Sequence, residues 1–295
     1  MQKVIFLTGF PAAGKSSFAQ RYIEKHPEVS LISADETRKR LYGSQDAYGE
    51  PSVIYRDLLR QFRSELENGN SIIYDAANLR KDYRLDFLRD LQEDLKDVEK
   101  SIIIIPTSKE ICIDRHLKRG RDIPLSKILP YFQIVEPPTY EEGWDNIWTC
   151  CAAAYIAAPF FSRADRDNAI LAAKILREKG IETYLPLEHK IENAWDFPNF
   201  EWGKKVFDAD IQAINQADTV IILSYGRIAS AGTSWEAGYA YGIGKRVILV
   251  EMPGVRLMSL MVANGRYATI KGLMELQDYD FIRMPMKTDD EMEQK

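Results

Sequence analysis

The sequence predicts an α/β protein built from two parallel sheets, each in a domain of its own. Its length of 295 residues suits two domains of roughly 150 residues each. Apolar, strand-like runs alternate with amphipathic helical stretches along the whole chain, which is typical of parallel-sheet architecture. A stretch rich in Pro, Gly and acidic residues at 136–148 interrupts this alternation. We therefore expect a domain boundary there, with one domain at 1–149 and the other at 150–295.

The first half is expected to contain four strands separated by helical stretches. Long stretches such as 16–26 and 53–69 have the apolar spacing of amphipathic helices. The strand candidates are the apolar runs 3–9, 29–34, 71–76 and 100–106.

The second half repeats the same alternation without an internal sequence repeat. The strand candidates are 153–161, 181–187, 218–224 and 246–252. The helical stretches between them are 167–180, 202–217 and 234–245. This order predicts a second wound sheet.

Composition limits the classes of function. With 45% hydrophobic and 28% charged residues, the chain is an ordinary globular protein, and no apolar run approaches the ~20 residues of a membrane helix. The net charge of −5 disfavours a long nucleic-acid track, because such binding requires many Lys and Arg contacts to phosphate. Cys112, Cys150 and Cys151 lack metal-ligand spacing, so we expect a reducing, cytoplasmic setting.

A phosphate-binding motif follows the first strand. The segment GFPAAGKS, from Gly9 to Ser16, fits G-x-x-x-x-G-K-[ST] and lies between an apolar strand and a helical stretch, as the motif requires. Gly9 and Gly14 allow backbone N–H groups to turn toward a phosphate, Lys15 would bind the β- and γ-phosphates, and Ser16, followed by Ser17, would ligate Mg²⁺. The motif predicts ATP or GTP binding, and a plain glycine-rich turn is the alternative.

A kinase also needs a group that positions the hydroxyl of a second substrate. Asp35 ends the second strand candidate, and Arg38 shares a helix face with it at i, i+3. A carboxylate there can orient the attacking hydroxyl while a guanidinium binds phosphate. The alternative is a capped surface helix with a local ion pair.

Three further residues complete the first candidate site. Asp75, at the end of the third strand candidate, can act on Mg²⁺ or its waters. Arg115 and Arg119 lie one helical turn apart, as residues that cover a bound phosphate would. A solvated basic helix end is the alternative for this arginine pair.

These residues together resemble the 5′-hydroxyl polynucleotide kinase family and its P-loop relatives. The segments GFPAAGKSS, DAANLR (75–80) and KRGRDIP (118–124) occur in the family's order. The resemblance implies ATP and Mg²⁺ at Lys15 and Ser16, Asp35 as general base, Arg38 at the acceptor's phosphate and Arg119 at the transferring phosphoryl group. Many members use small-molecule acceptors, so the acceptor of this kinase can be a nucleoside, a nucleotide or a nucleic-acid 5′ end. No phosphatase motif follows, which weakens a repair role.

The second half resembles the nucleoside 2-deoxyribosyltransferase superfamily over most of 153–275, which implies a flavodoxin-like (Rossmann-like), doubly wound parallel sheet. The resemblance lies in Tyr155 of YIAAPFF, Asp210 of DADIQAINQADTVI and Glu236 of GTSWEAGYAYGIGK. It implies that Glu236 is the nucleophile at the anomeric carbon, that Tyr155 helps hold it, and that Asp210 contacts or protonates the base. Cleavage through an oxocarbenium-like state needs such a pair of acids. The helix start at Gly232 favours an ionised Glu236.

One departure from this superfamily concerns Ser230, six residues before Glu236. Transferases of free nucleosides have an acid there, whereas the related 2′-deoxynucleoside 5′-monophosphate N-glycosidases have serine, which can donate to a 5′-phosphate. A later S-x-M segment of those relatives has its counterpart in Ser259, beside Met258, and comes from a neighbouring subunit. The resemblance therefore implies a homodimer and favours hydrolysis of a nucleoside monophosphate. An ordinary loop serine is the alternative for Ser230.

The leading hypothesis is a bifunctional enzyme with an ATP- and Mg²⁺-dependent kinase and an N-glycosidase, both acting on nucleosides or nucleotides. One alternative replaces the glycosidase with a true deoxyribosyltransferase that exchanges bases. Another is a non-catalytic nucleotide sensor.

Overall fold

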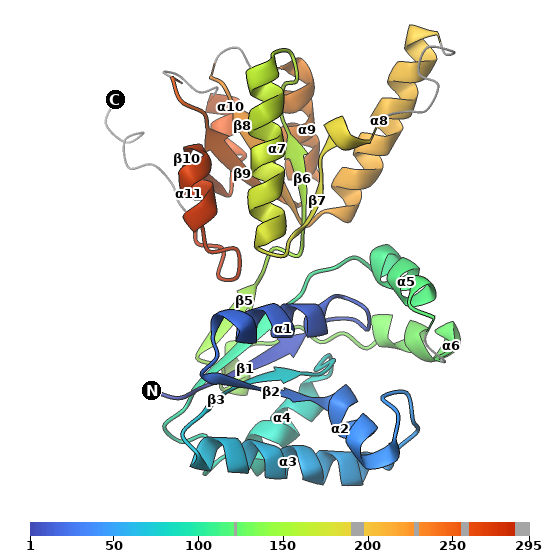
Figure 1. Ribbon diagram of the computed structural model, residues 1–295, viewed down its shortest axis with the longest axis vertical. Coiled ribbons are helices and arrows are strands. Elements are labelled where there is room, and N and C mark those ends of the chain that lie inside the picture. Colours follow the sequence, from blue (N-terminus) through green and yellow to red (C-terminus); the bar gives the residue numbers. More distant parts are fainter. Residues whose placement is uncertain (121–122, 190–197, 227–229, 255–259, 287–295) are drawn as a thin grey trace. The chain divides into compact units, whose positions relative to one another are not determined.

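The computed structural model describes residues 1–120, 123–189, 198–226, 230–254 and 260–286 of the chain (Figure 1). The chain divides into two compact units, Met1–Cys150 and Cys151–Lys295. Each unit contains a five-stranded sheet whose neighbouring strands are all parallel. The predicted α/β class with two wound parallel sheets is confirmed.

The first sheet has the strand order β2-β3-β1-β4-β5. Its strands are β1 (Lys3–Thr8), β2 (Val29–Ser33), β3 (Ser71–Asp75), β4 (Glu99–Ile104) and β5 (Asn146–Thr149). The sequence predicts the first four but treats β5 as part of a domain ending. This strand is short and only half-buried at the edge of the sheet, so it lacks the continuous apolar run of a central strand.

Helices cover both faces of this sheet (Figure 1). Core side chains of α3 and α4, including Phe62 and Phe87, pack with Phe6 of β1 and Trp144 on one face, and α1 lies on the other. The helices of this unit are α1 (Lys15–Lys25), α2 (Ala34–Tyr42), α3 (Pro51–Glu67), α4 (Lys81–Asp90), α5 (Lys109–Lys118), α6 (Leu125–Ile128) and the 3₁₀ turns η1 (Leu129–Phe132) and η2 (Tyr140–Glu142).

The second sheet has the strand order β10-β9-β8-β6-β7, which is the order 2-1-3-4-5 of the flavodoxin-like fold. In such a sheet, ligands bind at the carboxyl ends of the strands where the order reverses, here between β6 and β8. The strands are β6 (Ala153–Ala157), β7 (Glu182–Tyr184), β8 (Thr219–Ser224), β9 (Arg246–Glu251) and β10 (Ala268–Lys271).

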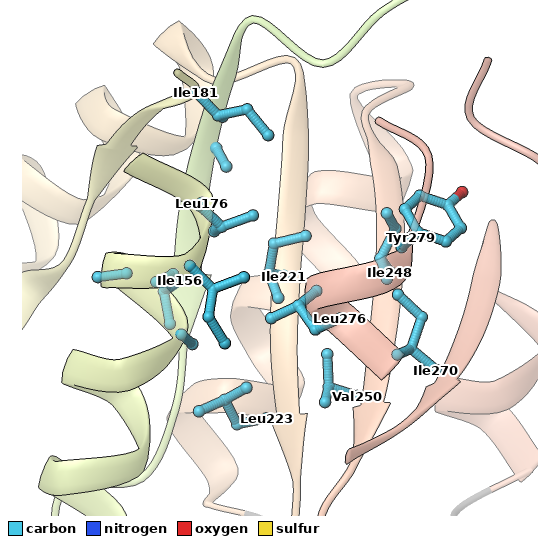
Figure 2. Close-up of a cluster of buried hydrophobic side chains, with 14 of the residues drawn as sticks. Ile156, Leu176, Ile181, Ile221, Leu223, Ile248, Val250, Ile270, Leu276 and Tyr279 are labelled. Atoms are coloured by element: carbon cyan, nitrogen blue, oxygen red, sulfur yellow. The ribbon is translucent and has the colours of Figure 1, made fainter. Parts of the chain in front are cut away.

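Side chains alternate between the two faces of this sheet. Ile156 of β6 packs with Leu176 of α7 and Leu276 of α11 on one face (Figure 2). The preceding residue, Tyr155, belongs to the core cluster on the opposite face, with side chains of α8 and α9, because successive strand residues point to opposite faces. The helices of this unit are α7 (Arg163–Glu178), η3 (Pro186–Glu188), α8 (Asn199–Gln216), α9 (Ala231–Gly242), α10 (Leu260–Asn264) and α11 (Gly272–Asp278).

A buried ion pair fixes the segment before β5 inside the first unit. Arg84 of α4 donates two hydrogen bonds of 2.7 Å to Glu142, and both side chains are fully buried. Trp144 also donates to Glu142 at 3.1 Å, and Arg84 donates to the carbonyl of Asn78 at 2.9 Å. Two residues of the acid-rich stretch that predicts an ending, Glu142 and Trp144, are thus buried in the first domain, and Glu142 holds the arginine that supports the loop after β3.

Replacing Arg84 with Met is expected to lower the free energy of unfolding of the first domain by about 3–5 kcal/mol, because it leaves the Glu142 carboxylate buried without its partner. Urea unfolding followed by tryptophan fluorescence measures the loss. The exposed Arg89→Met variant, which removes a surface pair with Asp86, is the control and should change the free energy by less than about 1 kcal/mol. Equal effects of the two variants would contradict the importance of the buried pair.

Candidate functional sites

The predicted phosphate-binding loop joins β1 to the first residue of α1. Gly14 precedes the helix at φ 104°, and Ala12 has φ 64°, so the loop turns through left-handed conformations. A side chain at Gly9 would bring its Cβ within 3.0 Å of the carbonyl oxygen of Ile105. The Gly9 N–H donates to the carbonyl of Ala77 at 3.2 Å. Close backbone packing on both sides therefore fixes where the loop begins.

Lys15 lies across this loop. Its Nζ donates to the carbonyl oxygens of Gly9 and Phe10 at 2.8 Å each, and the residue is buried. Burial lowers the pKa of the Lys15 amine to about 8, while the charges of Asp75 and Asp35 raise it. The ammonium group thus lies among the backbone groups that a phosphate would meet.

Asp75 at the end of β3 lies beside Ser16. Burial raises the pKa of the Asp75 carboxyl, and a hydrogen bond with Ser16 and the charge of Lys15 lower it. No group of three or more His, Cys, Asp or Glu side chains in the described residues could hold a metal ion by itself. A hydroxyl beside a carboxylate still fits Mg²⁺, which is usually bound by one or two protein oxygens together with phosphate and water.

The candidate acceptor residues lie at the start of α2. The Ser33 side chain caps this helix by accepting from the N–H of Glu36. Arg38 donates to Asp35 at 2.7 Å and to the carbonyl of Gln45 at 3.0 Å. Asp35 and Asp75 both contribute to the electrostatic environment of Lys15, so the structure brings the predicted base, the predicted metal ligand and the P-loop lysine together.

A buried carboxylate, Asp57 of α3, anchors α2. It accepts hydrogen bonds from Arg40 of α2, from Arg60 at 2.7 Å and from Gln61 at 2.8 Å. Gln61 also donates to the hydroxyl of Thr37 at 2.9 Å. No sequence motif predicts Asp57, because its arginine partners are 17 and 3 positions away on two helices.

The two predicted phosphate-covering arginines differ in their contacts. Arg115 donates to the carbonyls of Ala12 and Ala13 at 3.4 and 3.2 Å, so it supports the backbone of the loop. Thr107 donates to the same Ala13 carbonyl at 2.8 Å. Arg119 ends α5 with an exposed side chain, and its charge acts on Lys15 and Asp75.

In the second unit, the three predicted site residues meet at one hydroxyl group. Tyr155 donates to Oε1 of Glu236 at 2.7 Å, and Asp210 forms a hydrogen bond with the Tyr155 side chain as well. Burial raises the pKa of Glu236 to about 7 and that of Asp210 to about 6, while the contact with Tyr155 lowers both. Both carboxyl groups therefore have pKa values close to neutral pH.

Two further residues extend this site. The ring of Tyr184 stacks on Tyr155 at 5.7 Å between centroids, and His189 stacks on Tyr184 at 4.0 Å with an angle of 1° between the ring planes. The charge of His189 lowers the pKa of Asp210. Neither residue was predicted from the sequence. Tyr184 belongs to a predicted strand, but no nearby residue in the sequence indicates that its ring stacks on Tyr155 of β6.

Ser230 caps the N-terminus of α9 by accepting from the N–H of Thr233 at 3.3 Å. Beside it, a small pocket lies at the carboxyl end of β8. Its polar side chains include Ser224, Ser230, Thr233 and Ser234. Glu236 follows in the second turn of α9. Gly232 leaves room beside Ser230, since a Cβ there would lie 3.4 Å from its hydroxyl oxygen. Ser259 and Met258 lie outside the described residues.

Among the helices that the structure describes, none is both long and apolar enough to cross a membrane.

Comparison with known families assigns the two units separately. Residues 4–138 match the family model described as AAA domain, and residues 154–267 match the family model of nucleoside 2-deoxyribosyltransferase. The chain is also similar to L-seryl-tRNA(Sec) kinase of Methanococcus maripaludis, with 26% identity over 147 residues. That match covers 48% of this chain and 56% of the kinase, so the chain spans little more than half of its relative's length.

Two solved structures are also similar to parts of this chain. A 2-deoxyribosyltransferase from the psychrotolerant bacterium Bacillus psychrosaccharolyticus is 30% identical, with a TM-score of 0.42, and the match covers 47% of this chain and 99% of that one. A fungal RNA kinase is 15% identical, with a TM-score of 0.40, and the match covers 70% of this chain and 95% of that one.

Proposed function

Because this chain joins a kinase-like P-loop domain of the AAA type to a domain of the nucleoside 2-deoxyribosyltransferase family, we propose that it is a cytoplasmic enzyme with two nucleotide-directed activities. The first domain transfers the γ-phosphoryl group of ATP to a hydroxyl of a nucleoside, a nucleotide or a nucleic-acid 5′ end. The second cleaves the N-glycosidic bond of a nucleoside 5′-monophosphate. The homodimer implied by the resemblance belongs to the same proposal, and light scattering measures it.

The kinase proposal is supported by groups that gather at the carboxyl ends of β1, β2 and β3. Lys15 neutralises charge on the transferring phosphoryl group, and Asp35 accepts the proton of the attacking hydroxyl. Arg38 binds an anionic group of the acceptor. Bound Mg²⁺, beside Ser16 and Asp75, would supply charge neutralisation between the phosphates.

The glycosidase proposal is carried by the placement of Tyr155 between two acids. Glu236 in its ionised form attacks the anomeric carbon, and protonated Asp210 donates its proton to the departing base. Water then hydrolyses the glycosyl–Glu236 bond and releases the sugar 5-phosphate. By donating to Glu236, Tyr155 orients the carboxylate and offsets part of the rise in its pKa that burial causes.

Lys15→Ala is expected to lower ATP-dependent phosphorylation by about 100- to 1000-fold, the usual effect of removing one group that stabilises a developing charge.

Glu236→Gln should lower base release by roughly 10⁴-fold, because an amide cannot replace a carboxylate nucleophile. Products from Mg²⁺-ATP, nucleosides, monophosphates and a 5′-hydroxyl oligonucleotide are resolved by mass spectrometry. Each variant is the control for the other domain. A wild-type protein that binds these ligands without turnover would instead be a nucleotide sensor.

Base exchange is the second candidate for the second domain, because the family match is to deoxyribosyltransferases. Adding a free acceptor base separates the two: we expect base release that is independent of the acceptor and no new nucleoside. Ser230→Asp is expected to lower turnover of a monophosphate about 10-fold or more, and turnover of the matching nucleoside much less, because a carboxylate repels a 5′-phosphate. Equal losses for both substrates would contradict a phosphate contact at Ser230.

The rate of base release is expected to follow a bell-shaped pH profile with its maximum between about pH 6 and 7. Below this range both carboxyl groups are protonated, and above it both are ionised, since the pKa values are about 7 for Glu236 and about 6 for Asp210. The reactive form, with ionised Glu236 and protonated Asp210, is the minor singly protonated form, and its population is highest between the two pKa values. Tyr155→Phe should move the profile to higher pH. The Tyr155 hydroxyl lowers the pKa values of both acids, so both values rise when it is removed. Tyr184→Phe keeps the stacked ring and is the control. A Tyr155→Phe profile that moves to lower pH would refute this role.

A further inference from the structure

A chain of contacts connects the candidate acceptor residues to the phosphate-binding loop through aromatic and cationic side chains. Phe10 of the loop packs against Phe132 of η1, with 4.4 Å between ring centroids. At the other end of the same helical segment, Lys127 of α6 lies 5.6 Å from the ring centroid of Tyr48. We call Phe10, Tyr48, Lys127 and Phe132 the acceptor rim.

Both ends of the acceptor rim lie beside residues assigned to phosphoryl transfer. Tyr48 belongs to the loop between α2 and α3, and Arg38 donates to the carbonyl of Gln45 in that same loop. At the other end, the carbonyl of Phe10 accepts a hydrogen bond from Lys15. The rim therefore runs from the arginine that would bind the acceptor to the lysine that would bind the transferring phosphate.

The composition of this region is unusual for a surface. Tyr48 is 94% exposed, and Tyr131, Ile134 and Val135, next to Phe132, are 38–41% exposed. Exposed apolar side chains that gather in one place commonly mark a binding site. Besides Lys127, a second cation, Lys109, lies 5.6 Å from the ring centroid of Phe132. Flat rings with neighbouring cations fit a ligand that has both an aromatic ring and an anionic group.

We propose that the acceptor rim makes the kinase selective for acceptors that carry a nucleobase. The base stacks on Tyr48 and Phe132, and Lys127 attracts an acceptor phosphate when one is present. A plain sugar offers the same hydroxyl but cannot stack. This inference rests on the proposed kinase activity and assigns the residues that recognise the base of its acceptor.

The test compares a nucleoside with its base-free sugar as phosphate acceptor. It uses full-length protein with the Glu236→Gln substitution, so that the second domain does not consume the phosphorylated product. We expect Tyr48→Ala and Phe132→Ala each to lower kcat/KM for the nucleoside by about 10-fold, the scale of one lost base–aromatic stack, mainly through KM. Turnover of the sugar should stay unchanged. Tyr48→Phe and Phe132→Tyr, which keep the rings, should retain nucleoside turnover.

Tyr83→Ala, which removes an exposed ring of α4, is the matched control and should change neither acceptor. Tyr48→Ala is the decisive variant, since an almost fully exposed side chain contributes little to folding. Equal losses for nucleoside and sugar, or a wild-type protein that uses both acceptors equally well, would overturn the inference while the kinase proposal stands. No Lys15-dependent transfer to any acceptor would instead overturn the kinase proposal and this inference with it.

Discussion

Both candidate sites depend on carboxyl groups that the protein partly withdraws from water. Burial is the largest effect on Asp75, Asp210 and Glu236, and it raises the pKa of each. A desolvated carboxylate is costly, and each of these three has a hydroxyl partner that offsets part of the cost. The three carboxyl groups stay buried because the structure packs around them: the phosphate-binding loop lies over Asp75, and helices α8 and α9 over β6 carry Asp210 and Glu236.

The shared hydroxyl of Tyr155 couples the two acids of the second site. It donates its proton to Glu236, and its hydrogen bond with Asp210 lowers the pKa of that acid as well. Because the two pKa values are close, about 7 for Glu236 and about 6 for Asp210, the pair carries one proton between them at about pH 6.5. That proton lies more often on Glu236, and cleavage requires it to move to Asp210. The apparent pKa values describe this pair as a unit and not each residue alone.

The sequence predicts most of the fold and the central residues of both sites, because these signals are local. The loop motif contains its own helix start. Asp35 and Asp75 lie at the ends of predicted strands, and Glu236 lies near the start of a predicted helix; the apolar patterns of these elements are clear. Asp57, Tyr184 and His189 could not be predicted, because their roles arise from contacts between elements. β5 was missed for a related reason: it is short, half-buried and recognisable only from its pairing with β4.

The hydrogen bonds of Lys15 to its own loop have a consequence for nucleotide affinity. An ammonium group has three donors, and two of those on Lys15 already bind carbonyl oxygens, so a phosphate gains more than one hydrogen bond from this amine only by displacing a carbonyl. The measured affinity is then a difference between two bonded states. The formal charge of the phosphate, which a carbonyl lacks, supplies that difference, and neutral compounds of the same shape gain little from this lysine.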